Sequence, residues 1–377
     1  MALRHQVILD ESGWENRFPT LINQGGGRLL LVFWRSPARP QGRHMDIAME
    51  GQIMRSRDSG QTWSAPQLLI THDGQVSPTH PPAGEGDQPT VMMPYFHWVV
   101  LPQTEREMLE TRIPRVSDRA LRQDAYYAVV GAIEGAYVTR SQDGGASWSH
   151  RTRVDTQPFF WAGTRSLPTR TPGHRLLLAL YGRRAEDRGD TAFVVFSDDD
   201  GRTWSEPVVT ACDPEGSIEH QEPALLALSD EHILATYRIA RHEPAPGTEG
   251  DEILCNESQD GGQTWTDPRA TGLRGHPTDL IRLHDGAVLC VYGYRHPPCG
   301  IRAVLSQDNG ATWLAQQELV LRDDAVCSQP GAPATDIGYP FVTQLDDGTL
   351  MAVYYFDAGK GQRFLAATYF QIGDFFK

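Results

Sequence analysis

The chain has 377 residues, of which 40% are hydrophobic and 22% are charged, so it carries enough apolar material for a core and is not disordered as a whole. Its formal net charge of −14 lacks the positive field that binds a nucleic-acid backbone or an anionic bilayer. No apolar run approaches the roughly 18 residues of a membrane span, so we expect no nucleic-acid or membrane partner.

The N-terminal segment 1–17 is polar and acidic and does not resemble an export signal. The five cysteines are an odd number, widely spaced, and include no Cys-x-x-Cys pair, which indicates neither a disulfide framework nor a zinc site. They are Cys212, Cys255, Cys290, Cys299 and Cys327. We therefore predict a cytoplasmic protein with reduced thiols and no metal or other cofactor.

One pattern, Ser-x-Asp-x-Gly-x-x-Trp, recurs along the chain. Its five copies begin at Ser56, Ser141, Ser197, Ser258 and Ser306. The Asp side chain can accept hydrogen bonds from turn N–H groups, the Gly can take a positive φ, and the Trp can pack back over the loop. We interpret the copies as turns that stabilise the fold, outside any active site.

An apolar strand precedes most copies of the turn. These strands lie in 25–35, 173–184, 228–238, 283–295 and 345–357, with 93–102 in the corresponding place of the second unit. We interpret them as the inner strands of blades, each followed by a strand that runs into the turn. The pattern predicts an all-β fold, a six-bladed β-propeller. The last blade would close by pairing 363–372 with 5–11, which leaves no open edge.

The interval from Ser56 to Ser141 is the longest between copies. Within it, residues 104–132 are charged and rich in helix formers, and Pro114 interrupts them. We expect a helical insertion in blade 2. It could be a lid, an oligomer contact or a solvated surface excursion, and the sequence leaves these open.

The repeated turns resemble those of the sialidase (neuraminidase) superfamily, where they are called Asp boxes, and the resemblance covers essentially the whole chain. It implies a single sialidase-like propeller domain over 1–377. It also implies three arginines that hold the substrate carboxylate, a Tyr nucleophile paired with a Glu, and an Asp that acts as acid and base. Asp boxes also occur in propellers that are not enzymes, so the activity depends on finding these residues.

Three segments match the family's site. Arg17 in NRFPTL matches the family's Arg-x-Pro element and takes the first arginine position. Glu222 precedes Pro223 and lies sixteen residues before Arg238, so a strand, a hairpin and a returning strand would bring both to one blade edge. Tyr339, directly before a Pro and an apolar strand, matches the nucleophile. Glu219 is the alternative carboxylate.

The remaining matches are less complete. Arg302 is our third arginine, with Arg295 as the alternative on the same rim. Arg35 fits a second rim arginine that the family's acid/base Asp follows, but an extended loop separates it from Asp46. Asp46 is the nearest suitable carboxylate and Glu50 the next.

The resemblance thus implies a retaining exo-glycosidase for a terminal α-linked sialic acid or a related nonulosonic acid. Tyr339 would attack with help from Glu222, and Asp46 would act as acid and base. Arg17, Arg238 and Arg302 would hold the carboxylate. The alternatives are a propeller that binds an acidic glycan or a protein without hydrolysis, and a glycosidase for another acidic sugar. Homo-oligomer formation stays open.

Overall fold

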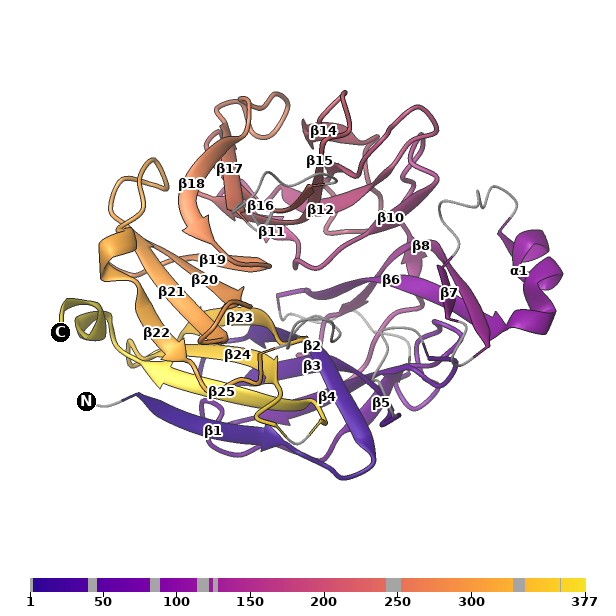
Figure 1. Cartoon of the computed structure of the whole chain (residues 1–377), viewed down its shortest axis with the longest axis horizontal. Coiled ribbons are helices and arrows are strands. Elements are labelled where there is room, and N and C mark those ends of the chain that lie inside the picture. The colour runs from indigo at the N-terminus through magenta and orange to yellow at the C-terminus, as the bar shows by residue number, and fades with distance from the viewer. Residues whose placement is uncertain are drawn as a thin grey trace.

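The computed structural model describes residues 3–39, 46–81, 89–113, 122–124, 128–241, 252–327, 336–359 and 361–377. Six antiparallel sheets stand around a common axis as the blades of a propeller (Figure 1). This confirms the predicted fold class. Buried clusters of apolar side chains fill the spaces between neighbouring sheets, so each blade buries both of its faces against its neighbours.

The first three blades run from the N-terminal half of the chain. Blade 1 contains β2 (Trp14–Asn23), β3 (Leu29–Pro37), β4 (Glu50–Ser56) and β5 (Gln67–Ile70). Blade 2 contains β6 (Val91–Pro102), β7 (Arg122–Asp124), β8 (Val129–Ser141) and β9 (Thr152–Arg153). Blade 3 contains β10 (Trp161–Gly163), β11 (Thr169–Arg170), β12 (Leu176–Arg183), β13 (Thr191–Ser197) and β14 (Val208–Ala211).

The last three blades complete the ring. Blade 4 contains β15 (Ile218–Ala227), β16 (Ile233–Arg241), β17 (Glu252–Ser258) and β18 (Arg269–Arg274). Blade 5 contains β19 (Thr278–Arg282), β20 (Val288–Tyr294), β21 (Gly300–Ser306) and β22 (Leu319–Arg322). Blade 6 contains β23 (Gly338–Gln344), β24 (Leu350–Phe356), β25 (Phe364–Phe370) and β1 (Arg4–Leu9). Short 3-10 helices lie at Gln103–Glu105, Ala315–Gln317 and Ile372–Phe376.

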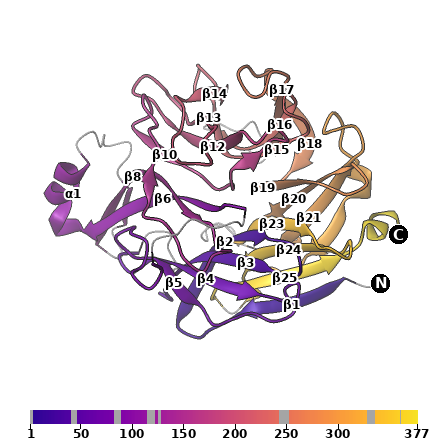
Figure 2. The same cartoon turned by 180° about the vertical axis from the view of Figure 1, so that it is seen from behind.

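The two ends of the chain close the ring. Strand β1 pairs antiparallel with β25, with Arg4 opposite Tyr369 and Val7 opposite Ala366. Figures 1 and 2 show both termini at the outer edge of this blade. The predicted closure is therefore confirmed, and it joins all six sheets into one ring.

Outside blade 2, the strongly apolar strands are second strands, not the inner ones that the sequence analysis predicted. In blades 1, 3, 4, 5 and 6 they are β3, β12, β16, β20 and β24, and at least one further strand lies closer to the axis. In blade 2 the predicted inner segment 93–102 lies in β6, which is the first strand of its sheet, as predicted. A second strand is buried on both faces, which favours a continuous apolar run. First strands such as β15, with the sequence IEHQEPALLA, carry polar residues and a proline and lack that signal.

The Asp boxes are turns, as predicted. In each copy the Ser is the last residue of a strand, as Ser258 is of β17. The Ser258 hydroxyl donates to Asp260 and accepts a hydrogen bond from the Gly262 N–H at 2.8 Å. The Trp265 indole N–H donates to the Gly262 carbonyl oxygen. The polar groups of these side chains thus make hydrogen bonds within the turn.

The described part of the expected insertion in blade 2 contains one α-helix, α1 (Arg106–Arg112), between β6 and β7. It lies at the rim of the ring in Figure 1 and buries Leu109 against Val99 and Val130. Pro114 lies outside the described residues. Among the described residues, no helix is long and apolar enough to cross a membrane.

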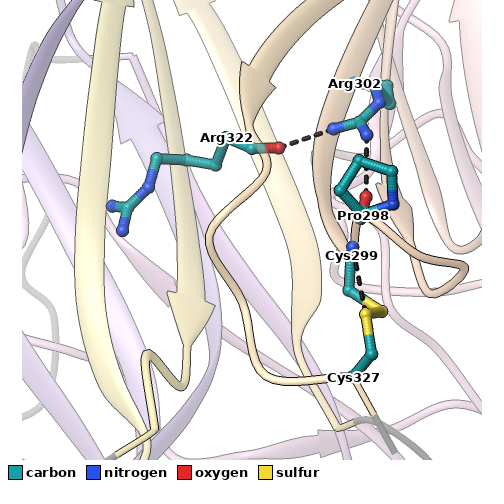
Figure 3. Close-up of a disulfide and its surroundings, with 5 residues drawn as sticks. All are labelled: Pro298, Cys299, Arg302, Arg322 and Cys327. Atoms are coloured by element: carbon teal, nitrogen blue, oxygen red, sulfur yellow. Dashed lines mark hydrogen bonds between the residues drawn. A yellow bond between two sulfur atoms is a disulfide. The ribbon is translucent and has the colours of Figure 1, made fainter.

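Cys299 and Cys327 form a disulfide, which contradicts the predicted absence of disulfides (Figure 3). The two residues are 28 apart in the sequence, and their Cα atoms are 5.6 Å apart. Cys299 directly precedes β21 and Cys327 follows β22, and these antiparallel neighbours bring the two cysteines together. Disulfides are typical of oxidising compartments, so the cysteines no longer favour a reducing cytoplasm.

Thiol counting tests this disulfide. The unfolded, unreduced chain should expose three thiols, those of Cys212, Cys255 and Cys290, and five after reduction. Cys327→Ser should lower the free energy of unfolding by roughly 3 kcal/mol, because the crosslink no longer restricts the unfolded chain. Cys212→Ser is the matched control and should change it little, since Cys212 is exposed and free. Five thiols before reduction would contradict the disulfide.

Candidate active site

A cavity of about 770 Å³ opens where the six blades meet. Its walls take side chains from every blade, among them Phe18 from β2, Tyr95 from β6, Tyr181 from β12, Glu222 from β15 and Tyr339 from β23. Aromatic and charged groups both line it. A cavity of this size at the axis of the ring is suited to a small ligand such as a sugar.

Tyr339, Glu222 and Arg238 meet in this cavity. The Tyr339 hydroxyl donates a hydrogen bond to Glu222 Oε1 at 2.5 Å. Arg238 Nη1 donates to Glu222 Oε2 at 3.0 Å and to the Tyr339 oxygen at 3.2 Å. The structure thus brings together three of the residues that the sequence singled out, although Glu222 and Tyr339 are 117 residues apart.

The electrostatics of the pair place the proton on Tyr339. Burial opposes ionisation of Glu222, but Arg238 and the Tyr339 hydroxyl outweigh it and hold the pKa of Glu222 below its usual value. Burial, together with the nearby Glu222 carboxylate, raises the pKa of Tyr339. The resting pair is therefore a neutral phenol beside a carboxylate, which is the arrangement that a tyrosine nucleophile with a carboxylate base requires.

A shared backbone feature directs these side chains. Phe18, Glu222 and Tyr339 each precede a proline on the first strand of a blade, and their φ angles are 51°, 47° and 50°. Non-glycine residues rarely adopt a positive φ, which costs backbone strain. At each position the register with the second strand shifts, which indicates a bulge. The residue before the proline lines the cavity in all three blades.

Arg17 does not line the cavity. In blade 1 the pre-proline position belongs to Phe18, whose ring centroid lies 4.8 Å from that of Tyr339. Arg17 is 1% exposed and its Nη2 donates to Glu15 Oε2 at 3.0 Å, while its Nε lies 3.7 Å from Asp336 Oδ2. The structure thus holds the predicted first arginine in a buried ion-pair network.

Arg302 also lies outside the cavity. Figure 3 shows its guanidinium donating to the main-chain oxygens of Pro298 and Arg322, beside the disulfide. Arg295, the alternative named from the sequence, lines the cavity instead, with its guanidinium carbon 5.9 Å from the centroid of the Tyr339 ring. We therefore move the proposed third arginine from Arg302 to Arg295.

Of Arg35 and Asp46, only Asp46 lies at the cavity. Arg35 pairs with Glu11 and stacks 4.1 Å from the Trp14 ring, and it is not among the cavity residues. Asp46 does line the cavity. Its carboxylate accepts hydrogen bonds from Arg39 and, at 2.9 Å, from the Ala48 N–H. Of the two candidate acids, Asp46 reaches the cavity and Glu50 does not.

Sequence reasoning missed several charged residues of the cavity. Arg183 donates to Glu219 Oε1 at 2.6 Å and to Asp190, which makes Glu219 part of a separate polar cluster. Arg183, Arg238 and Arg295 each lie in the second half of a second strand or just beyond it, one or two residues after a Tyr. This repeated position is a signal that could have identified Arg183 and favoured Arg295. Arg165, which follows the three-residue β10, carries no such signal.

No set of three or more His, Cys, Asp or Glu side chains in the described part of the chain could hold a metal ion.

The chain matches the family model described as a BNR repeat-like domain over residues 126–352. No curated protein matches it. A protein of unknown function from Dyadobacter fermentans DSM 18053 is similar, with a TM-score of 0.78 and 26% identity over 97% of this chain and 98% of that one. The Hadza microbial sialidase Hz136 is also similar, with a TM-score of 0.63 and 16% identity over 95% and 66% of the two chains.

The α-L-arabinanase of Penicillium chrysogenum has a TM-score of 0.59 and 13% identity over 95% of this chain and 93% of that one. At such identities the sialidase and the arabinanase show a common fold and leave the substrate open.

The ionisation of Glu222 should make the free energy of unfolding depend on pH. Because its folded pKa lies below the unfolded value, ionised Glu222 stabilises the fold above about pH 4.3, and this contribution is lost as pH falls through the folded pKa. Glu222→Gln should cost roughly 3 kcal/mol at neutral pH, since it leaves Arg238 without its buried partner. The difference in the free energy of unfolding between Glu222→Gln and the wild type should shrink below about pH 4.3.

Denaturant unfolding from acid to neutral pH measures this difference. Glu252→Gln is the control, because Glu252 pairs with Arg241 at 2.8 Å in the same blade but is 38% exposed in its side chain. Exposed pairs contribute little, so its effect should be within about 1 kcal/mol. A Glu222→Gln difference that does not change with pH would contradict the assigned ionisation.

Proposed function

The chain belongs to the BNR repeat-like domain family, and we propose that it is a retaining exo-glycosidase for an α-linked acidic sugar, a sialic acid or a related nonulosonic acid. The observation that supports this most is the hydrogen bond from Tyr339 to Glu222 beside Arg238 in the axial cavity. A neutral phenol can approach an anionic sugar without the repulsion that a carboxylate nucleophile meets. Residues 1–377 would act as one catalytic propeller domain.

In the first step, Tyr339 is the nucleophile. Its oxygen bonds to the anomeric carbon as the bond to the leaving oxygen breaks, and its proton passes to Glu222 Oε1, 2.5 Å away. A free phenol has a pKa near 10 and is a weak nucleophile at neutral pH, so this base is required. Arg238 contacts both partners and stabilises negative charge that moves between them.

Asp46 is the proposed acid and base. It protonates the leaving oxygen in the first step. In the second step it takes a proton from water, whose oxygen bonds to the anomeric carbon and releases Tyr339, which regains its proton from Glu222. Asp46 would exchange its contact with Arg39 for the leaving group on substrate binding.

Arg238 and Arg295 are the proposed carboxylate-binding residues. Both line the cavity close to Tyr339. Guanidinium groups bind carboxylates through paired, charge-assisted hydrogen bonds, so local charge can bind an anionic sugar although the whole chain is acidic. The likeness to a sialidase adds support for the fold that carries such a site.

A glycosidase for a different acidic sugar is the second candidate. The observation that favours it is the position of Arg17, which is paired with Glu15 and does not face the cavity. A site with two carboxylate-binding arginines constrains the acid less than a site with three. The substrate range of the enzyme decides between these two candidates.

Tyr339→Phe tests the proposed chemistry. With aryl α-sialosides and aryl glycosides of other acidic sugars, we expect kcat to fall roughly thousandfold or more, because the nucleophile is lost. The first product released by the wild type should retain the anomeric configuration, as followed by NMR. Tyr354→Phe is the control, since Tyr354 is a buried tyrosine outside the cavity that hydrogen bonds Thr368.

Equal turnover by Tyr339→Phe and wild type would refute the mechanism. Saturable binding of acidic sugars without release would instead support a non-catalytic binding propeller.

Arg295→Met and Arg302→Met separate the two candidates for the carboxylate-binding arginine. Arg295→Met should raise KM by roughly ten- to hundredfold through loss of a charge-assisted hydrogen bond. Arg302→Met should leave KM unchanged, since Arg302 bonds to backbone oxygens outside the cavity. Steady-state kinetics and melting temperatures of both variants measure this, and a larger KM effect at Arg302 would reverse the assignment.

A further inference from the structure

Arg165 crosses the axis of the ring. It follows β10 in blade 3, and its two terminal nitrogens donate to main-chain oxygens in two other blades, Nη1 to Thr278 of β19 and Nη2 to Pro340 of β23. These partners lie 113 and 175 residues further along the chain. One side chain of the cavity wall therefore ties blades 3, 5 and 6 together.

The contact at Pro340 is next to the proposed nucleophile. Pro340 directly follows Tyr339, whose φ of 50° makes this peptide part of a strained bulge. The guanidinium carbon of Arg165 lies 5.8 Å from the centroid of the Tyr339 ring and 4.9 Å from that of Phe341. Arg165 thus holds the backbone on one side of Tyr339 and faces its ring.

A second hydrogen bond holds β23, the strand that carries Tyr339. Asp279, next to Thr278 in β19, accepts a hydrogen bond from the Val342 N–H of β23 at 2.8 Å. Burial raises the pKa of Asp279 to about 6, although Arg165 acts against this. Arg165 and Asp279 are therefore two partly buried groups of opposite charge, and both hydrogen bond the strand that carries Tyr339.

We propose that Arg165 is a positioning residue for the Tyr339–Glu222 pair, which holds the peptide after Tyr339 in place and supplies a permanent positive charge that favours ionised Glu222. This inference rests on the proposed function, since it assigns a role within that catalytic pair. Arg165 lines the cavity, but its two terminal nitrogens donate to the backbone oxygens of Thr278 and Pro340, so we assign it to positioning the pair and not to binding the substrate.

An arginine suits this role for two reasons. Its planar guanidinium can donate two hydrogen bonds in fixed directions, and it keeps its charge when buried. A buried charge is costly unless it is offset, and Asp279 and Glu222 both offset it. A purely structural link between blades could use an apolar side chain without this cost.

The charge on Arg165 is one of several near Glu222. Arg238 and Arg165 favour its ionisation, and the Tyr339 hydroxyl donates to it. Other titratable or charged groups that act on Glu222, Tyr339, Tyr181 or Arg238 include Asp190, Arg295, His276 and Tyr355. Loss of Arg165 alone should therefore shift the titration of Glu222 without abolishing it.

Arg165→Met tests the proposal in the full-length protein. Tyrosine labelled with ¹³C at the ring carbon that bears the oxygen gives a signal that responds to the hydrogen bond with Glu222, and Tyr339→Phe identifies that signal. In the wild type it should change at an acid pH below the usual pKa of glutamate, and in Arg165→Met this change should move to higher pH. With an aryl sialoside, kcat should fall on the order of a hundredfold, with a smaller change in KM, because a reacting group is misplaced.

Two further variants separate positioning from stability. Arg302→Met removes another buried arginine that donates to two backbone oxygens, but away from the cavity. It should lower the melting temperature and leave both the signal and kcat as in the wild type. Arg165→Lys keeps the charge and loses the paired hydrogen bonds, so the acid transition should stay near its wild-type pH while kcat falls. This variant also serves if Arg165→Met does not fold.

The outcomes distinguish this inference from the proposed function. An unchanged Tyr339 titration and unchanged kcat in Arg165→Met, with only a lower melting temperature, would overturn the positioning role. A shifted titration in a protein that cleaves no acidic glycoside would support the positioning of the pair while the proposed function fails.

Discussion

The geometry of the site depends on one backbone constraint, the strained residue that precedes a proline on three of the innermost strands. Phe18, Glu222 and Tyr339 take positive φ values at the same place in blades 1, 4 and 6. Each bulge interrupts the ladder with the second strand and lets the side chain enter the cavity. The surrounding blades hold these conformations, since no isolated strand would keep them.

Charge then decides what the converging side chains can do. Glu222 is 6% exposed and would resist ionisation if it were alone. Arg238 offsets this cost at 3.0 Å, and the Tyr339 hydroxyl supplies a further hydrogen bond. The result is a carboxylate that accepts a hydrogen bond from Tyr339, the proposed nucleophile, and can accept its proton. Burial thereby contributes to reactivity here, although it costs stability.

The sequence was sufficient for features set by local spacing. The Asp boxes and the ring closure were predictable because each depends on a short pattern or on the two chain ends. Glu222 and Arg238 were predictable because one hairpin joins them. The orientation of Arg17 could not be predicted, because it depends on Glu15 and on the distant Asp336. The disulfide could not be predicted either, because the pairing of strands brings Cys299 to Cys327. Arg165 gave no signal, since its partners lie in two other blades.

The pairing of β1 with β25 also affects when the ring can close during synthesis of the chain. Blade 6 takes β1 from one chain end and β23 to β25 from the other, and it carries Tyr339. When the first five blades have been synthesised, the ring therefore still has a gap, and the cavity lacks Tyr339, the proposed nucleophile. The cavity is complete only after β23 to β25 have been made and β25 has paired with β1.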